Sequence, residues 1–335
     1  MKLSIIVPVY NVEEYLERCV RSLEDQDIPR SDYEIIVVND GSPDNSKEVV
    51  ERLQRELSNI ILINQENQGV SMARNAGIDR ASGEYLVFVD PDDYVAPNSF
   101  ASILTTVDRD KPQIVFLGYR FLNLDESVRK EILHEDKEGK VFSGIDAYHL
   151  SRGDGQTDPD RSVAILYNLA FVQNHSIRYL GNVPYLEDGE FLARVMCLAE
   201  KCSFHSFPFY QRTTRPGSAT NSRSFFSKRA IEGFVLAASS LKNFQASNAV
   251  ETQRVFLNQP IAKFTLLCVQ SCVSVRSIGN ARAVLNLLGK NNLRYLDLSE
   301  CNRTYSRYGR IYNISPYFFL VFWALKALAS RLKLV

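Results

Sequence analysis

The sequence of 335 residues lacks most of the features that mark secreted proteins. Its six cysteines form no Cys-x-x-Cys pair and no regular framework, so we expect reduced, mostly buried thiols rather than disulfides. No basic segment followed by an apolar one precedes Leu3, where a strand pattern begins at once. We therefore expect a cytoplasmic protein. Internal repeats and low-complexity segments are also absent.

An excess of charge of one sign is lacking as well, because 39 Lys and Arg residues balance 39 Asp and Glu residues. Whole-chain charge thus neither favours nor excludes nucleic acid, and no other feature leads us to expect a nucleic-acid partner. Cys197, Cys202 and His205 lie close together in the sequence, but a zinc site needs a fourth ligand. Structural packing is the preferred interpretation of these three residues.

The first hundred residues alternate between strand and helix patterns. Apolar, β-branched runs predict strands over residues 3–9, 33–38, 60–63 and 85–89. Helical spacing follows Val12, a second helix is expected to have Asp44 as its N-cap, and a third covers residues 70–81 with Gly83 at its C-cap. This alternation predicts an α/β fold with a mostly parallel sheet, which binds ligands at the carboxyl ends of its strands.

The pattern is mixed beyond Tyr94. We expect a strand over residues 113–120, an exposed charged segment over 125–140, a polar loop over 153–160, and helices over 166–171 and 190–198. Helical spacing dominates from Phe226 onward. The sequence therefore predicts a catalytic domain over residues 1–225 and an α-helical C-terminal region over residues 226–335.

Asp90-Pro91-Asp92-Asp93 follows directly on the apolar run of residues 85–89. Three neighbouring carboxylates repel one another unless a cation lies among them, so the cluster indicates a divalent-metal site for a phosphorylated ligand. The alternative is a solvated acidic turn that Pro91 breaks. The context of the remaining motifs favours the metal site.

Five motifs resemble, in order, those of family-two glycosyltransferases, which are inverting nucleotide-sugar enzymes with the GT-A fold. The resemblance covers roughly residues 1 to 220. The motifs are Ser4–Asn11, Val38–Ser42, Gln68–Gly77, Phe88–Asp93 and Glu187–Asp188. It implies a GT-A domain, a nucleotide-sugar donor and a role in the synthesis of bacterial capsule or other polysaccharide.

The resemblance implies that the first two motifs bind the nucleotide. Asp40 would contact the base, while Pro8, Tyr10 and Asn11 would form a wall of the same pocket. Taken alone, Asp40 is equally typical of a turn before Gly41. The assignment of a UDP-sugar rests on the resemblance.

The Asp-x-Asp pair is expected to act on the diphosphate. A bridging Mn²⁺ or Mg²⁺ neutralises the charge that develops on a diphosphate leaving group. The resemblance assigns Asp92 to the metal and Asp90 to the ribose or the metal. Asp93 is either a further ligand or a brace for the loop, and Pro91 replaces a serine that is frequent in similar enzymes.

Asp188 is the expected general base, since an acceptor hydroxyl needs a carboxylate to take its proton during attack. One base opposite the leaving group implies a single displacement with inversion. The alternative is an ordinary charged helix start. Arg74, Arg212 and Arg215 are expected beside the nucleotide and pyrophosphate, with structural or solvated arginines as the alternative.

The C-terminal tail has no acidic residue after Glu300 but contains six basic ones. The aromatic-rich run over residues 317–325 is too short to span a bilayer. Two interpretations stay open: peripheral contact with the anionic inner leaflet of the membrane, or packing against the protein's own core. The basic residues are Arg303, Arg307, Arg310, Lys326, Arg331 and Lys333.

Other activities fit less well. The loop after the first strand lacks the Gly-x-Gly-x-x-Gly of NAD-dependent enzymes and the Gly-rich basic loop of nucleotidyltransferases. Similar processive synthases carry Gln-x-x-Arg-Trp, whereas the sole tryptophan here is Trp323. A catalytically inactive nucleotide-sugar-binding protein would not need both Asp92 and Asp188. The sequence thus predicts a metal-dependent, inverting transferase that uses a UDP-sugar and a glycan or lipid-linked acceptor.

Overall fold

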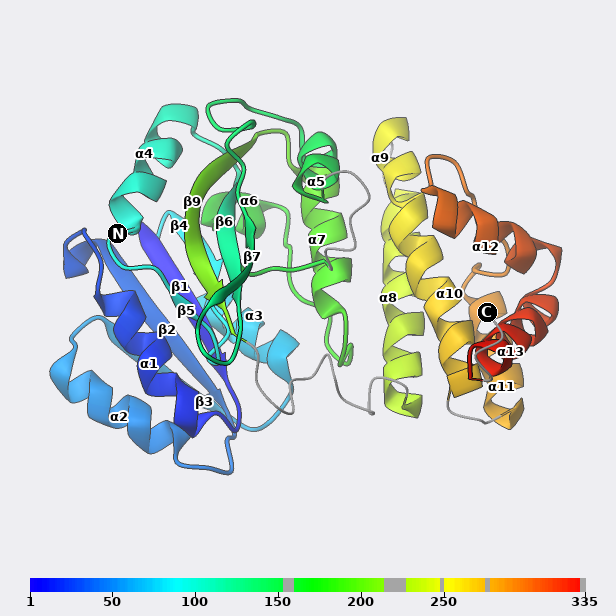
Figure 1. The fold of residues 1–335 in the computed structure, drawn as a ribbon, viewed down its shortest axis with the longest axis horizontal. Helices are drawn as coiled ribbons and strands as arrows, with labels where there is room; N and C mark the ends of the chain where they lie inside the picture. Colours follow the sequence, from blue (N-terminus) through cyan, green and yellow to red (C-terminus); the bar gives the residue numbers. More distant parts are fainter. Residues whose placement is uncertain (153–159, 214–226, 248–249, 275–277, 332–335) are drawn as a thin grey trace. The chain divides into compact units, whose positions relative to one another are not determined.

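The computed structural model describes residues 1–152, 160–213, 227–247, 250–274 and 278–331. It contains two compact units: Met1–Gly181 with Leu198–Pro216, and Asn182–Cys197 with Gly217–Val335. The first unit holds the sheet and the second is helical (Figure 1). The helical unit includes Asn182–Cys197, a segment that the predicted boundary near residue 225 assigns to the catalytic domain.

The first unit is built on one sheet with strand order β3-β2-β1-β4-β8-β6-β9-β5, to which β7 adds by pairing with β6. Strands β3, β2, β1 and β4 run parallel, whereas β8 is antiparallel to both β4 and β6. The strands are β1 Leu3–Val9, β2 Tyr33–Asp40, β3 Ile60–Gln65, β4 Tyr85–Phe88, β5 Tyr94–Val95, β6 Ile114–Leu122, β7 Val128–Ile132, β8 Ile165–Asn168 and β9 Cys202–Arg212.

Helices of the first unit follow the strands as the alternating pattern predicts. The chain steps outward from β1 to β3 and then returns to β4, so right-handed crossovers place α3 on the face opposite to α1 and α2. Helix α3 packs on β1 and β2. The helices are α1 Glu13–Glu24, η1 Arg30–Asp32, α2 Ser46–Glu56, α3 Val70–Arg80, α4 Phe100–Asp110, α5 Gly144–Arg152 and α6 Leu169–Asn174.

The core lies in the parallel strands. All residues of β1 and β2 are buried, which matches their continuous apolar sequences and a sheet covered on both faces. Helix α1 buries Leu16, Cys19, Val20 and Leu23 at the spacing that the sequence analysis identified. The predicted α/β fold is confirmed, and the sheet is parallel through β3, β2, β1 and β4.

The helix expected over residues 166–171 is wrong in its first half. Ile165–Asn168 forms β8, and only Leu169–Asn174 is helical, with Asn168 as N-cap accepting a hydrogen bond from the Phe171 N–H. A short apolar run does not distinguish a buried strand from a helix. Here the gap between β4 and β6 decides, because β8 pairs with both.

Two expected caps also differ. The N-cap of α2 is Asn45, and Asp44 instead accepts hydrogen bonds from the N–H of Glu13 at 2.9 Å and of Ser46 at 3.2 Å, so it joins the starts of two helices. The C-cap of α3 is Ala81 rather than Gly83. A Cβ at position 83 would come within 2.6 Å of the Leu3 backbone, so this glycine permits close approach to β1.

The second unit is helical from its first element to its last. Helix α10 packs on α8, α11, α12 and α13. No helix in the described ranges is long and apolar enough to cross a bilayer. The helices are α7 Glu187–Leu198, α8 Lys228–Ser247, α9 Glu251–Phe256, α10 Asn258–Ser274, α11 Ile278–Lys290, α12 Arg303–Ile314 and α13 Pro316–Arg331.

Candidate active site

Three neighbouring parallel strands, β2, β1 and β4, bring their polar carboxyl-terminal segments to one edge of the sheet. In the register, Val9 of β1 pairs with Asn39 of β2, and Ile6 pairs with Phe88 of β4. The residues that follow Val9, Asn39 and Phe88 therefore occupy the same edge. This is the convergence of motifs that the sequence predicts.

The loop after β1 is tied to the loop after β2. Pro8 is buried within β1, whereas Tyr10 and Asn11 are exposed. Asn11 has φ +55°, a left-handed conformation that asparagine tolerates better than most residues, and its N–H donates to Ser42 Oγ at 3.4 Å. The Ser42 N–H in turn donates to Asn39 Oδ1 at 3.0 Å. Exposed Tyr10 and Asn11 thus lie beside the end of β2.

Asp40, the last residue of β2, is only 2% exposed and accepts three hydrogen bonds from its own chain. Gln65 Nε2 and the Gln68 N–H donate to Oδ1 at 2.7 and 2.9 Å, and the Gly69 N–H donates to Oδ2 at 2.7 Å. Asp40 therefore fixes the loop that leads into α3. Gly69 has φ +89°, so a side chain there would be strained.

Arg74 and Asp90 form the central ion pair of this edge. Arg74 projects from α3 and its side chain is 3% exposed, while that of Asp90 is 35% exposed. The guanidinium NH2 donates to Asp90 Oδ1 at 3.0 Å and lies over the rings of Phe88 and Tyr179. The structure thus places Arg74 as a positioning residue for Asp90, which joins the third and fourth motifs.

Asn75, beside Arg74 on α3, exchanges two hydrogen bonds with the backbone of Tyr179. Its Nδ2 donates to the Tyr179 carbonyl at 2.9 Å, and the Tyr179 N–H donates to its Oδ1 at 2.8 Å. Since the Tyr179 ring lies under the Arg74 guanidinium, Asn75 holds one side of the arginine's pocket. Its role in this structure is one of support.

Asp93 faces the interior, unlike Asp90. It is buried, and its Oδ2 accepts from Tyr210 Oη at 2.7 Å while its Oδ1 accepts from the Thr213 N–H at 2.7 Å. Burial, followed by the nearby charges of Asp90 and Asp92, raises the pKa of Asp93 to about 7. Of the two roles that the sequence leaves open for Asp93, this arrangement is that of a brace.

The backbone of the Asp90–Asp93 turn is held from distant parts of the chain. Tyr210 Oη accepts from the Asp90 N–H at 3.2 Å, and the Asp92 carbonyl accepts from Thr213 Oγ1 at 2.7 Å and from Arg18 at 3.2 Å. Sequence reasoning missed these supports because the partners lie 74 or more positions away. Thr213 directly follows Arg212 in the basic segment that the analysis did single out.

Removal of the Tyr210 hydroxyl is expected to destabilise the first unit. In Tyr210→Phe, buried Asp93 loses one donor and the Asp90 N–H loses its acceptor, and each unmet polar group costs about 1–3 kcal/mol. Urea unfolding followed by circular dichroism would show a lower midpoint. Tyr295→Phe removes a hydroxyl from a side chain that is 70% exposed and should leave the midpoint unchanged. Equal midpoints for both variants would contradict the bracing role of Tyr210.

The donor set at this turn fits a divalent cation that also uses ligand oxygens. Asp93 is turned inward, so Asp90 and Asp92 are the carboxylates of this turn that would hold such a cation. Within the described ranges no group of three or more His, Cys, Asp or Glu side chains is placed to hold a metal. Mg²⁺ is commonly held by one or two carboxylates together with phosphate oxygens and water. The turn therefore matches a metal that binds together with a diphosphate.

Asp188 lies in the first turn of α7, in the helical unit. The preceding Leu186 has φ +59°, which is unusual for a side chain with a branched Cγ. Two residues after Asp188, in the same first turn, buried Glu190 accepts two hydrogen bonds from Arg194 and one from Ser240 Oγ of α8. Helix α7 is thereby fixed to α8 close to Asp188.

Of the other residues predicted to contact the ligands, Arg212 lies at the end of β9, and the rest fall outside the described residues. Arg212 is the last residue of β9, and its guanidinium lies over the Phe121 ring at 5.4 Å. Arg215 lies outside the described residues, as does most of the polar loop over residues 153–160. Their expected roles stay predictions.

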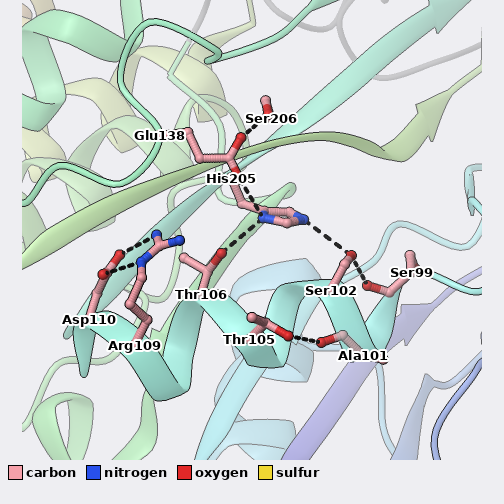
Figure 2. A network of polar contacts seen from close by, with 10 residues as sticks. All are labelled: Ser99, Ala101, Ser102, Thr105, Thr106, Arg109, Asp110, Glu138, His205 and Ser206. Atoms are coloured by element: carbon pink, nitrogen blue, oxygen red, sulfur yellow. Dashed lines mark hydrogen bonds and ion pairs between the residues drawn. The ribbon is translucent and has the colours of Figure 1, made fainter.

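His205 belongs to a polar network between β9 and α4 (Figure 2). Its Nδ1 lies 3.0 Å from Thr106 Oγ1 and its Nε2 lies 3.3 Å from Ser102 Oγ. Glu138 also faces Nδ1 at 3.5 Å, while burial lowers the pKa of His205. Both ring nitrogens are engaged by hydroxyl groups, which agrees with packing rather than zinc binding.

Comparison with known proteins gives a consistent family. The family model described as glycosyl transferase family 2 matches residues 4–157. The uncharacterized glycosyltransferase EpsJ of Bacillus subtilis is 46% identical over 116 residues, which span 35% of this chain and 33% of EpsJ. The putative glycosyltransferase EpsH of the same organism is 28% identical over 271 residues, which span 79% of this chain and 76% of EpsH.

Among solved structures, residues 1–349 of TarS from Staphylococcus aureus, crystallised with UDP-GlcNAc, superpose with a TM-score of 0.68. The match covers 96% of this chain and 90% of that chain at 20% identity, and it shows that the fold is shared. This fold is GT-A followed by a helical region. Residues 4–157 therefore form a glycosyl transferase family 2 domain, and EpsH, which matches along most of the chain, is itself named a putative glycosyltransferase.

Proposed function

We propose that this glycosyltransferase moves a sugar from a UDP-sugar to a glycan or lipid-linked saccharide acceptor in a metal-dependent single displacement. The observation that carries the proposal is the Asp90–Asp93 turn at the carboxyl edge of the sheet. In this turn Asp93 faces inward and Asp90 forms an ion pair with Arg74. It offers two carboxylates to a cation bound with a diphosphate. The fold shared with TarS, solved with UDP-GlcNAc, supports a uridine nucleotide.

The nucleoside is proposed to lie at the ends of β1 and β2. Tyr10 and Asn11 are exposed there, and Asp40 fixes the adjacent loop through the backbone of Gln68 and Gly69. A carboxylate has about four acceptor sites, so Asp40 retains one for a base in addition to the three bonds it makes. Pro8, which is buried in β1 two residues before Tyr10, is proposed to support this side of the nucleoside pocket.

The diphosphate is proposed to lie beside Asp90 and Asp92. A bound Mn²⁺ or Mg²⁺ supplies charge neutralisation for the departing diphosphate. Arg74 orients Asp90 through their ion pair, while Arg212 and Arg215 are proposed to contact the pyrophosphate.

Asp188 is proposed to remove the proton of the acceptor hydroxyl. The acceptor oxygen attacks the anomeric carbon, the bond from that carbon to the diphosphate oxygen breaks, and UDP leaves with the bonding pair. Attack opposite the leaving group inverts the anomeric configuration. The left-handed backbone of Leu186 supports a functional role for this turn, since such conformations are frequent at active sites.

The protein is proposed to act in the cytoplasm, where thiols stay reduced. All six cysteines are free, and five of them are buried.

A thermal-shift screen tests the donor. UDP-hexoses and UDP-N-acetylhexosamines are expected to raise the melting temperature in the presence of Mn²⁺, and much less when either Mn²⁺ or the UDP-sugar is added alone, because the metal is proposed to bind together with the diphosphate. Stabilisation by a GDP- or TDP-sugar alone would overturn the uridine assignment. Release of pyrophosphate from UTP and a sugar phosphate would instead favour a nucleotidyltransferase.

A further inference from the structure

Helices α12 and α13 form a hairpin whose inner side packs on the helical unit. Phe319 of α13 is buried and its ring lies within 6.3 Å of the rings of Tyr308 and Tyr312 and within 6.1 Å of Trp323. Helix α13 also packs on α10 (Figure 1). One of the two interpretations that the sequence leaves open, packing on the protein's own core, therefore holds for this side of the helix.

The opposite side of α13 is apolar and exposed. Six large apolar side chains between residues 314 and 328 are each 52% to 76% exposed: Ile314 ends α12, and the other five recur at helical spacing along α13. Sixteen such exposed side chains occur in the described part of the chain, so more than a third fall in these 15 positions. We call this set the outer stripe. It consists of Ile314, Tyr317, Phe318, Val321, Leu325 and Leu328.

Basic side chains accompany the outer stripe. Arg303, Arg307 and Arg310 of α12 are all exposed and lie at positions i, i+4 and i+7, on one side of that helix. In the described part of the chain, none of these three arginines forms an ion pair with a carboxylate. Lys326 of α13 is exposed too, with its ammonium over the ring of Trp323. From residue 301 onward the sequence contains no acidic residue.

An exposed apolar stripe accompanied by basic side chains favours a membrane surface over a second copy of the chain as the binding partner. A second copy of the chain in a symmetric contact would bring two identical arginine rows together without carboxylates from either hairpin. An interfacial helix instead lays aromatic and aliphatic side chains into the acyl boundary while basic side chains meet anionic headgroups. We propose that the outer stripe and the α12 arginine row dock this enzyme on the surface of a bilayer that contains anionic phospholipid.

Vesicle co-sedimentation of the full chain tests the proposal. The protein is expected to sediment with phosphatidylethanolamine–phosphatidylglycerol vesicles and far less with phosphatidylcholine vesicles. The double variant Phe318→Asp/Val321→Asp should weaken binding about tenfold or more, since each buried apolar side chain contributes that order of affinity. The matched control Leu124→Asp/Val128→Asp places the same two charges at exposed apolar positions of the first unit and should bind as the wild type does.

A second variant tests the contribution of the three α12 arginines in the same assay. Arg303→Gln/Arg307→Gln/Arg310→Gln should reduce binding to the anionic vesicles about tenfold or more and reduce its salt dependence. The control Lys47→Gln/Arg55→Gln/Lys290→Gln removes three exposed charges elsewhere and should not. Unchanged sedimentation of the outer-stripe variant would overturn the proposal. So would a wild-type dimer in sedimentation velocity that this variant abolishes, because a second copy would then cover the stripe. No sugar donor is present, so failure here leaves the proposed function untouched.

Discussion

Asp188→Asn is expected to lower the turnover number about 10²–10⁴-fold while the dissociation constant for UDP in Mn²⁺ stays unchanged. The amide has the size of the carboxylate but cannot take the acceptor's proton. Asp188 lies in the helical unit, on α7, whereas the proposed nucleotide contacts come from the sheet unit. The measurement is UDP release with a saturating donor, alongside UDP titration by calorimetry.

Glu187→Gln is the matched control, since both carboxylates lie in the first turn of α7. Each stabilises the helix N-terminus by about 0.3–1 kcal/mol, so the two variants lose a similar structural contribution. Only Asp188→Asn should lose turnover by orders of magnitude. If Asp188→Asn transferred sugar at the wild-type rate, or if both variants were equally impaired, Asp188 would not be the base.

Asp92→Asn is expected to abolish the Mn²⁺-dependent part of UDP binding and to reduce activity on the order of 10²–10³-fold. A metal at a transferring phosphate contributes several kcal/mol, and each 1.36 kcal/mol corresponds to a factor of ten. The adjacent carboxylate, Asp93, accepts hydrogen bonds from Tyr210 and Thr213, so we do not expect it to replace Asp92. UDP titrations with and without Mn²⁺ would measure the change.

Asp93→Asn provides the contrast at the same turn. Its carboxylate is committed to Tyr210 and Thr213, so this substitution should lower the melting temperature yet preserve the gain in UDP affinity that Mn²⁺ brings. The reverse pattern, with metal dependence lost in Asp93→Asn and kept in Asp92→Asn, would exchange the roles assigned to the two residues.

The parallel half of the fold could be predicted because its sequence signals are local. A strand buried on both faces is a continuous apolar run, and residues 3–9 form β1 with the bounds that the sequence gives. The helix predicted over residues 166–171 was partly wrong because the local signal there is ambiguous. Its apolar residues fit the spacing of a strand as well as that of a helix, and the pairing of residues 165–168 between β4 and β6 depends on the whole sheet.

In the candidate site, too, features that depend on neighbouring residues could be predicted, and contacts between distant parts of the chain could not. The motifs that end at Asn11, Ser42 and Asp93 were found because strand ends carry polar residues in sequence. The inward orientation of Asp93 was not predictable, since Tyr210 lies 117 positions away and Thr213 lies 120 away. Arg74 was expected beside the nucleotide, whereas the structure shows its pairing with Asp90.

The two interpretations of the tail, membrane contact and packing on the protein's own core, concern different sides of α13. Phe319 is buried on one side and Phe318, the neighbouring residue, is exposed on the other. A pattern of apolar residues all round a helix does not reveal which side meets the protein.

The strand order has a practical consequence for dividing this protein. The family match ends at residue 157, before β8 and β9, which lie inside the sheet rather than at its end. A fragment cut there would expose the unpaired backbone of β4 and of β6, and such edges recruit other chains. It would also lose Tyr210 and Thr213, so the Asp90–Asp93 turn would lack its supports. A recombinant fragment that retains the supported Asp90–Asp93 turn must therefore extend at least through Thr213, the residue after β9.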